Sequence, residues 1–357
     1  YWYFLTIIFL HLLNSPAQEI VRWLQENEKA NKKKEEKVLL KDVKILLLGN
    51  TNIGKSNLLH LWKQRYNKKN SSNSYPENSN STHGLVYKEF KKDNNSPVLH
   101  VWDFGGQEYF HATHQLFFSP DALHVLLWAK KTHQTRLENE QVFQLDYWLR
   151  CSEQLSKGDS DIEMVLIENY IDHREEGKNI EFYTHFPEQQ FLEKFNIYSP
   201  HIEGKQLDKP PFMLNACSVS LKYEKRLQGM FELLEERVEM LYHKAEYPKI
   251  YKDIRDKLAR STRKTWTLSD YKKEFKEKDN VILKTLDSAG CLLYFHEQLP
   301  DKIFTKPKLL LDLIYKDILN EELKSNQGKI TYELKNAEEN NDLGLITKDL
   351  ETLLSAF

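Results

Sequence analysis

The sequence predicts an α/β protein in which a mostly parallel sheet with flanking helices is followed by a smaller, winged-helix-like α/β domain. Three observations lead to this prediction. Short apolar runs alternate with amphipathic segments from residue 38 to about 245, which is typical of a parallel sheet covered on both faces. Two glycine-containing polar runs directly follow apolar runs, as ligand-binding turns do at the carboxyl ends of parallel strands. After residue 248 the pattern changes to consecutive helices and one strand.

The composition leaves room for two domains and excludes several classes of protein. The chain has 357 residues, and 51 basic and 53 acidic residues give a net charge of -2, so charge does not indicate nucleic-acid or membrane binding. The cysteines, Cys151, Cys217 and Cys291, are odd in number and far apart, which suits neither a disulfide framework nor a zinc motif. A reducing, cytoplasmic location is therefore expected.

Residues 1–37 are expected to form a helical cap or linker ahead of the sheet. Residues 1–13 are apolar, but no basic leader precedes them and 15–18 make a poor cleavage site, so secretion is disfavoured. A short amphipathic helix over 16–24 and a charged run over 26–37 follow, and no run of 18 apolar residues suggests a membrane span. The absence of an initial Met suggests a piece of a longer protein.

The apolar runs define the expected elements in chain order. Strands are expected at 42–48, 84–90, 97–103, 122–129, 162–167 and 211–214, and helices between them at 55–65, 134–154 and 221–242. From a boundary near 245–248, helices are expected at 249–264, 268–274, 279–288 and 307–319, with a strand at 290–296. We therefore expect a first domain over 38–245 and a second over 246–357.

The first polar run fits the phosphate-binding loop G-x-x-x-x-G-K-[ST] at every defined position, between an apolar strand and a helix. Such a loop aims backbone N–H groups at phosphate oxygens, while Lys55 would contact the β- and γ-phosphates and Ser56 would bind Mg²⁺. A turn with an incidental Lys-Ser is a weak alternative because the whole octet matches. The expected nucleotide contacts here are Gly49, Asn50, Thr51, Asn52, Ile53, Gly54, Lys55, Ser56 and Asn57.

The second polar run, W-D-F-G-G-Q-E at 102–108, also ends an apolar strand. Asp103 would hold Mg²⁺ through water, and Gln107 could orient the attacking water. Gly106 has the conformational freedom to turn its amide toward a γ-phosphate. The alternative is an ordinary Gly-Gly turn after a strand. Phosphate loop and carboxylate together predict a nucleotide site.

Base recognition is expected at the end of the fifth strand. Asn169 and Asp172 fit the guanine signature N-K-x-D of Ras-like GTPases, with Tyr170 in the Lys position. A carboxylate at Asp172 can accept two N–H donors of guanine, whereas adenine would leave it unpaired at a cost on the order of several kcal/mol. Ala216 and Cys217, after the last strand, would offer backbone N–H groups to the base. A plain strand end is the alternative for both short patterns.

Thr82 is the candidate for a residue that reaches both Mg²⁺ and the γ-phosphate. It lies between the two phosphate motifs, directly before the second expected strand. A loop that orders around a triphosphate and relaxes after hydrolysis is the usual switch device. Catalysis is therefore expected to depend on Lys55, Thr82 and Gln107. The expected Mg²⁺ ligands are Ser56, Thr82 and Asp103.

Three runs of the first domain together resemble the Roc (Ras of complex proteins) GTPase domain of Roco proteins. They are S-T-H-G at 81–84, the W-D-F-G-G-Q-E run, and Y-F-H-A-T-H-Q at 109–115; ordinary small GTPases do not carry the combined run from W-D-F-G-G-Q-E to H-A-T-H-Q. Residues 292–296 and 304–310 look like the start of the COR domain that follows Roc. Residues 14–21 are similar to the closing cap of a leucine-rich-repeat array.

The resemblance implies a GTP-hydrolysing switch in a multidomain signalling protein, with GTP or GDP and Mg²⁺ bound. It also implies a homodimer formed largely through the later part of COR. Tyr170 and residues 215–217 depart from the small-GTPase pattern, so guanine selectivity is less well supported than phosphate binding. No arginine finger can be assigned, and slow intrinsic turnover is therefore expected.

Two other functions stay open on the sequence alone. One is a nucleotide-binding interaction scaffold with little or no hydrolysis, against which Gln107 argues. The other is nucleic-acid binding through residues 266–296 and the basic helix before them. The near-neutral net charge and the acids within that helix disfavour it.

Overall fold

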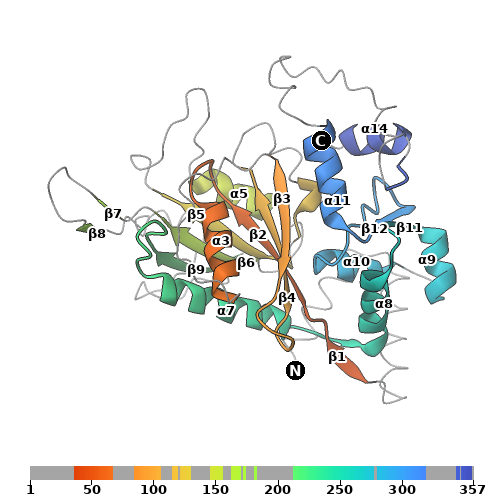
Figure 1. Ribbon diagram of the computed structural model, residues 1–357, viewed down its shortest axis with the longest axis horizontal. Helices are drawn as coiled ribbons and strands as arrows, with labels where there is room; N and C mark the ends of the chain where they lie inside the picture. The colour runs from red at the N-terminus through yellow and green to blue at the C-terminus, as the bar shows by residue number, and fades with distance from the viewer. Residues whose placement is uncertain are drawn as a thin grey trace.

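Figure 1 shows the computed structural model of the chain. It describes residues 36–66, 84–105, 115–119, 121–129, 145–155, 162–169, 172–173, 181–182, 212–276, 280–318, 343–345 and 347–355. These residues form a first unit around one large sheet and a second, mostly helical unit beside it. Within these ranges, no helix has the length and apolar character needed to cross a membrane.

The first unit is built on a six-stranded sheet with the order β3-β4-β2-β5-β6-β9. β3 is antiparallel to β4, and all other neighbours are parallel. The strands are β2 (Asp42–Leu48), β3 (Leu85–Phe90), β4 (Val98–Phe104), β5 (Leu123–Trp128), β6 (Ile162–Glu168) and β9 (Phe212–Ser218). A separate small ribbon pairs β7 (Asp172–His173) with β8 (Glu181–Phe182). The predicted fold class, a mostly parallel sheet with flanking helices, is confirmed.

The central strand β2 sends its side chains into two cores, one on each face of the sheet. The flanking helices are α3 (Lys55–Tyr66), α5 (Leu145–Leu155) and α7 (Leu227–Tyr242). Val43, Ile45 and Leu47 face the core that α3 and α7 complete. Leu46 and Leu48 face the core that α5 shares with the second unit. The sheet is therefore buried on both faces, as parallel sheets require.

The second unit packs short helices around a small β-ribbon. Its elements are β10 (Glu246–Pro248), α8 (Lys249–Arg260), β11 (Thr265–Thr267), α9 (Leu268–Phe275), α10 (Val281–Ser288), β12 (Lys302–Phe304), α11 (Pro307–Asp312), the π-helical segment η4 (Leu313–Ile318) and α14 (Thr347–Ser355). β11 pairs antiparallel with β12. Tyr271, Leu283 and Ile303 are fully buried between the helices, so this unit has a core of its own.

Two connections join the units. β1 (Lys37–Leu39) pairs antiparallel with β10, and Leu40 is buried in the core of the second unit. On the sheet, Phe117 of the 3-10 turn η2 (Gln115–Phe117) packs against Phe295 and Tyr315 of the second unit. The second unit therefore completes the hydrophobic core on one face of the sheet.

The second unit differs from the prediction in three places. The strand predicted at 290–296 is wrong, because Leu293 forms an isolated bridge with Phe304 and the partner of β11 is β12. The helix predicted at 249–264 ends at Arg260, four residues early. The helix predicted at 307–319 becomes π-helical at Leu313.

In the first unit the predicted strands are present, most of them within one residue of the predicted bounds, and two bounds shift further. β9 continues beyond residue 214 to Ser218, and α7 begins at Leu227 instead of 221. α5 begins at Leu145 within the described residues. The helix predicted at 16–24, and residues 134–144 of the helix predicted at 134–154, lie outside the described residues.

Candidate nucleotide-binding site

The loop after β2 turns so tightly that two of its positions require glycine. Gly49 and Gly54 have φ angles of 127° and 103°, which residues with a side chain rarely adopt. A Cβ atom on Gly49 would lie 2.3 Å from the carbonyl oxygen of Leu127, and one on Gly54 would lie 2.7 Å from Nδ2 of Asn169. The loop leads directly into α3, whose first N–H groups can hold an anion.

Lys55 is buried, and its ammonium group is folded back over the loop. Its Nζ donates hydrogen bonds of 2.8 Å to the carbonyl oxygens of both Gly49 and Asn50, and the residue is 5% exposed. These bonds hold the positive charge against the loop backbone. A phosphate group cradled by the loop would therefore lie next to that charge.

Ser56 and Asp103 meet although 47 residues separate them in sequence. Because β4 lies beside β2, Asp103 is opposite Leu47 and close to the start of α3. Oγ of Ser56 donates a 2.7 Å hydrogen bond to Oδ2 of Asp103. A hydroxyl and a carboxylate oxygen are the hard ligands that Mg²⁺ prefers. The fold thus brings together two of the three predicted metal-binding residues.

Asn169 ties three loops together at the end of the sheet. Its Nδ2 donates to the carbonyl oxygen of Ile53 at 2.8 Å, and its Oδ1 accepts from the N–H of Leu221 at 3.1 Å. Its own N–H donates to the carbonyl oxygen of Trp128, and the residue is 1% exposed. Asn169 therefore fastens the phosphate loop to the turn after β9. The sequence indicated a contact to the base at this position and not this bracing contact.

Trp148 is a site contact that the sequence did not reveal. It lies on α5, is 4% exposed, and its Nε1 donates a 3.3 Å hydrogen bond to Oδ1 of Asn50 in the phosphate loop. Ninety-eight residues separate the pair. No local pattern marks a helical Trp as a loop contact, because a buried aromatic residue at helical spacing reads as ordinary core.

The turn after β9 begins later than predicted. Ala216 and Cys217 lie inside β9, opposite Leu166 and Ile167, so they are strand residues and not part of a loop over a base. Burial raises the pKa of the Cys217 thiol to about 12, which keeps it protonated. The chain leaves the strand at Val219, whose N–H donates to the carbonyl oxygen of Glu168 at 2.8 Å.

Glu168, the last residue of β6, is held in place by the same turn. Its Oε2 accepts a 2.7 Å hydrogen bond from Oγ of Ser218, and both residues are buried. The pair joins the ends of β6 and β9 directly beside Asn169. This contact was not predicted either, since Ser218 was not placed at a strand end.

The other predicted site residues lie outside the described residues. They are Thr82, Gly106 and Gln107. Asp172 lies in the short strand β7, and its side chain is not described. The phosphate and Mg²⁺ side of the predicted site is therefore assembled from Gly49 to Asn57, Asp103 and Asn169, whereas the switch and base positions stay predictions.

A second cluster of possible metal ligands, Asp42, His100 and Cys291, lies away from this site. Arg255 donates to both carboxylate oxygens of Asp42, at 2.5 and 2.8 Å. Nε2 of His100 lies 2.8 Å from Oδ1 of Asp42, and Nδ1 lies 2.7 Å from the hydroxyl of Tyr87. A guanidinium group on the carboxylate would repel a divalent cation. The cluster is thus a hydrogen-bonded network between the two units.

A phosphate loop after the central parallel strand, with a carboxylate on the neighbouring strand, defines the first unit as a Ras-like P-loop GTPase domain. Residues 44–172 match the family described as "Ras of Complex, Roc, domain of DAPkinase". The first unit is therefore similar to the Roc domain of Roco proteins.

Relatives among characterised proteins cover different parts of the chain. A Roc-COR-CHAT protease from an unknown prokaryotic organism is 25% identical over 300 residues, which is 78% of this chain and 26% of that protein. The probable serine/threonine-protein kinase roco5 of Dictyostelium discoideum is 25% identical over 42% of this chain and 5% of that protein. Human Rab-20 is 30% identical over 38% of this chain and 50% of that protein. The chain thus spans a small part of the large relatives.

A solved structure extends the likeness of the fold to both units. The structure of Methanosarcina barkeri Roco2 RocCORdC bound to GDP matches with a TM-score of 0.61 and 21% identity, over 90% of this chain and 91% of that one. At this identity the match supports the fold. It covers the second unit as well as the sheet.

Proposed function

We propose that the chain is a Mg²⁺-dependent, slowly hydrolysing GTPase that switches between GTP- and GDP-bound states within a multidomain Roco protein. One observation carries the proposal: Asn169 braces the phosphate loop while Ser56 and Asp103 meet beside it. A residue proposed to lie near the base, a loop suited to phosphate and two oxygen ligands suited to Mg²⁺ thus lie close together, which supports the proposal. The Roco2 structure with GDP bound supports a guanine nucleotide in this place.

The residues of the site suit phosphoryl transfer by electrostatic stabilisation. Lys55 and the N–H groups at the start of α3 would bind the charged phosphate oxygens. Gln107 would position the attacking water, and the amide of Gly106 would contact the γ-phosphate. Asp172 would select guanine through its two N–H donors. Thr82 would close over the triphosphate and release on hydrolysis.

Ser56 and Asp103 fit Mg²⁺ by the chemistry of their oxygens. Ser56 would bind the ion directly, Asp103 would hold it through water, and Thr82 would join them in the triphosphate state. When bound, the ion neutralises charge on the β- and γ-phosphates. Ala216 and Cys217 are strand residues, so we place the backbone contacts to the base in the turn that begins at Val219.

The test is nucleotide content and turnover. The nucleotide that co-purifies is released by denaturation and identified by HPLC, and GDP or GTP is expected; an adenine nucleotide would overturn the role of Asp172. The purified chain is then incubated with Mg²⁺-GTP beside Lys55→Ala. Equal GTP turnover in the two proteins would refute the proposal that the chain is a GTPase.

A nucleotide-holding scaffold without useful hydrolysis is the second candidate. Slow turnover is expected in either case, because no arginine finger can be assigned. Gln107→Leu separates the two: the GTPase loses most of its single-turnover rate, whereas a scaffold keeps its residual rate unchanged. Binding of GDP serves as the control, since Gln107 is not expected to contact it.

We propose the same division of the chain as the motifs indicated: 1–37 as the cap of a repeat array, 38–245 as Roc, and 246–357 as part of COR. The pairing of β1 with β10 means that residues 37–39 pack with the later domain. A homodimer through the COR region and a cytoplasmic location belong to this proposal. Sedimentation of the GDP and GTP states tests the dimer.

A further inference from the structure

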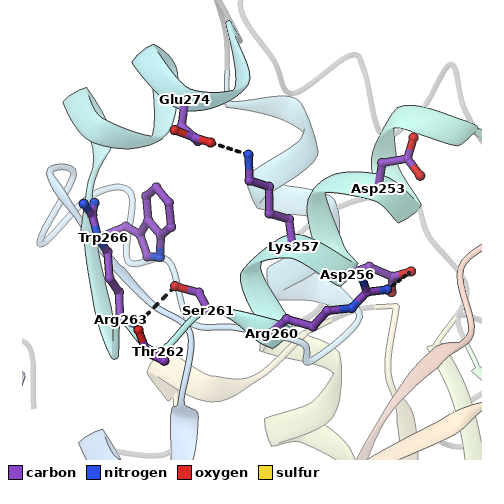
Figure 2. Close-up of a pocket in the computed structure, with 9 residues that line it drawn as sticks. All are labelled: Asp253, Asp256, Lys257, Arg260, Ser261, Thr262, Arg263, Trp266 and Glu274. Atoms are coloured by element: carbon purple, nitrogen blue, oxygen red, sulfur yellow. Dashed lines mark hydrogen bonds and ion pairs between the residues drawn. The ribbon is translucent and has the colours of Figure 1, made fainter.

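The second unit carries a surface groove of about 660 Å³ between α8 and α9 (Figure 2). α8 lines it with Asp253, Asp256, Lys257 and Arg260, the following turn with Ser261, Thr262 and Arg263, and the far wall with Trp266 and Glu274. Lys257 and Glu274 form an ion pair across it. None of these residues belongs to the nucleotide loop, so the groove needs its own explanation.

Trp266 forms an unusual wall for such a polar groove. The residue is 7% exposed, and its Nε1 is buried with no hydrogen-bond partner in the described part of the chain. The hydroxyl of Thr265, next to it in β11, is also buried without one. A buried donor without an acceptor costs about 1–3 kcal/mol. A ligand that accepts a hydrogen bond from the indole would recover part of that cost.

The segment that forms the groove is basic, while the lining itself is balanced. Ten basic and four acidic residues lie between Lys249 and Lys276, and the lining carries three basic and three acidic residues. Two of the three lining carboxylates already have a cation: Asp256 pairs with Arg255 at 3.0 Å, and Glu274 with Lys257. An anionic ligand would therefore be attracted by the exposed arginines at the rim.

Arg260 and Arg263 are available to such a ligand. Arg260 is 82% exposed, and its contact with Asp256 is 3.8 Å long. Arg263 is 57% exposed, lies 3.5 Å from Asp270, and places its guanidinium group 4.7 Å from the centre of the Trp266 ring. Exposed ion pairs of this kind contribute about 0–1 kcal/mol. A new carboxylate can therefore replace them at little cost.

We infer that this groove binds a short acidic peptide segment of a partner protein, with its carboxylates on Arg260 and Arg263 and a hydrogen-bond acceptor on the indole of Trp266. A peptide is favoured because the lining also contains the acidic residues Asp253, Asp256 and Glu274. The uniform charge of a nucleic-acid backbone or an anionic bilayer would meet these acids, whereas a peptide can set a neutral residue opposite them. The inference does not depend on the nucleotide site.

The test is fluorescence polarisation of a fluorescein-labelled peptide of alternating Glu and Gly, titrated with the full chain at low salt. A matched peptide of alternating Gln and Gly should not bind. Reversing both rim charges with Arg260→Glu and Arg263→Glu should weaken binding about tenfold. Trp266→Phe, which keeps a ring and removes the N–H donor, should weaken it about threefold to tenfold.

The control variant makes the same change in charge elsewhere. Lys88→Glu with Lys91→Glu alters two exposed lysines of the first unit and should leave peptide binding within twofold. If both double variants lost peptide affinity equally, binding would reflect general charge attraction and not the groove, and the inference would be overturned. Tighter binding of a single-stranded DNA oligonucleotide or of phosphatidylserine vesicles, lost in the arginine variant, would also overturn it. GDP binding of all variants should stay unchanged and shows that they are folded.

Discussion

The two faces of the central sheet are buried equally well and by opposite means. On the face that α3 and α7 cover, β2 presents Val43, Ile45 and Leu47 to an apolar cluster, and charge enters through the pair of Glu163 with Arg237 of α7. On the other face the same strand begins with Asp42 and Lys44, 7% and 3% exposed, before its leucines. Two further strands bring His100 and His124 to this face, also buried. The first face therefore depends mainly on apolar burial, and the second needs more polar partners.

The second unit supplies partners for the charged residues of β2. Arg255 holds Asp42 with two hydrogen bonds. Burial raises the pKa of Asp287 on α10 to about 6, and the nearby charge of Lys44 partly opposes this rise. Lys44 also lies over the ring of Trp102, with Nζ 5.0 Å from its centre. A different docking position would leave buried charges unpaired, which costs several kcal/mol per ion. We infer that the polar face fixes where the second unit docks, while the apolar face contributes general stability.

The largest test of this contrast is Arg255→Met. It removes the guanidinium group and leaves the Asp42 carboxylate buried, so the free energy of unfolding should fall by about 3–5 kcal/mol. Denaturant unfolding of the full chain measures the change. Arg260→Met, on an arginine with an 82% exposed side chain, should stay within about 0.5 kcal/mol. If both variants lost a similar free energy of unfolding, the buried pair of Arg255 and Asp42 would stabilise the chain no more than an exposed arginine does.

The apolar face is tested by Leu234→Ala on α7. Leu234 is fully buried against the sheet, and a cavity there should cost about 3 kcal/mol. Leu234→Met keeps the volume and should cost less than about 1.5 kcal/mol. The same unfolding assay applies. If the methionine variant lost as much as the alanine variant, this face would depend on specific shape more than the contrast allows.

The polar face should make stability depend on pH through His124. Its Nε2 lies 3.2 Å from the carbonyl oxygen of Ser119, and burial lowers its pKa to about 4. In the unfolded chain, His124 binds a proton near pH 6.5. The contribution of His124 to the free energy of unfolding is therefore fully present above that pH, and it falls toward pH 4 by up to about 1.4 kcal/mol per pH unit. His124→Gln should remove this slope. Subtracting the two unfolding curves cancels the contribution of Asp287; a zero difference would refute the assignment.

The smallest effect expected is that of Trp148→Phe, which links the polar face to the nucleotide. The variant keeps an aromatic ring on α5 and loses the hydrogen bond to Asn50. The loop should hold its ligand less tightly by about 1 kcal/mol. Dissociation of fluorescent GDP measures this, with Trp266→Phe as the control, because Nε1 of Trp266 has no hydrogen-bond partner in the described part of the chain. Equal dissociation rates in both variants would show that the contact is incidental.

The sequence predicted the strands of the sheet because each contains a mostly apolar run bounded by turn residues. β9 was cut short at residue 214, since Asn215 interrupts the apolar run while the backbone continues to pair with β6. The tight turn between β2 and α3 was predicted because its conformation is local; its binding of phosphate stays a prediction. Trp148 and Ser218 were missed because their roles depend on residues far away in the sequence.

The predicted strand at 290–296 failed for an instructive reason. Its side chains do alternate, with Leu292 and Tyr294 in the core of the second unit and Leu293 and Phe295 in the core shared with the sheet. Alternation here reflects a segment between two cores and not a strand in a sheet. A period of two therefore indicates burial on two sides, and pairing has to be established separately.

The pairing of β1 with β10 has a consequence for how the chain is made. β1 leaves the ribosome well before β10. Glu36 and Lys249, which lie next to these two strands, are 213 residues apart in the sequence. At about 5–20 residues per second, that gap lasts on the order of 10–40 s. During this time Lys37–Leu39 is an unpaired edge strand that other chains can capture. The order of synthesis thus exposes this strand until the second unit emerges to cover it.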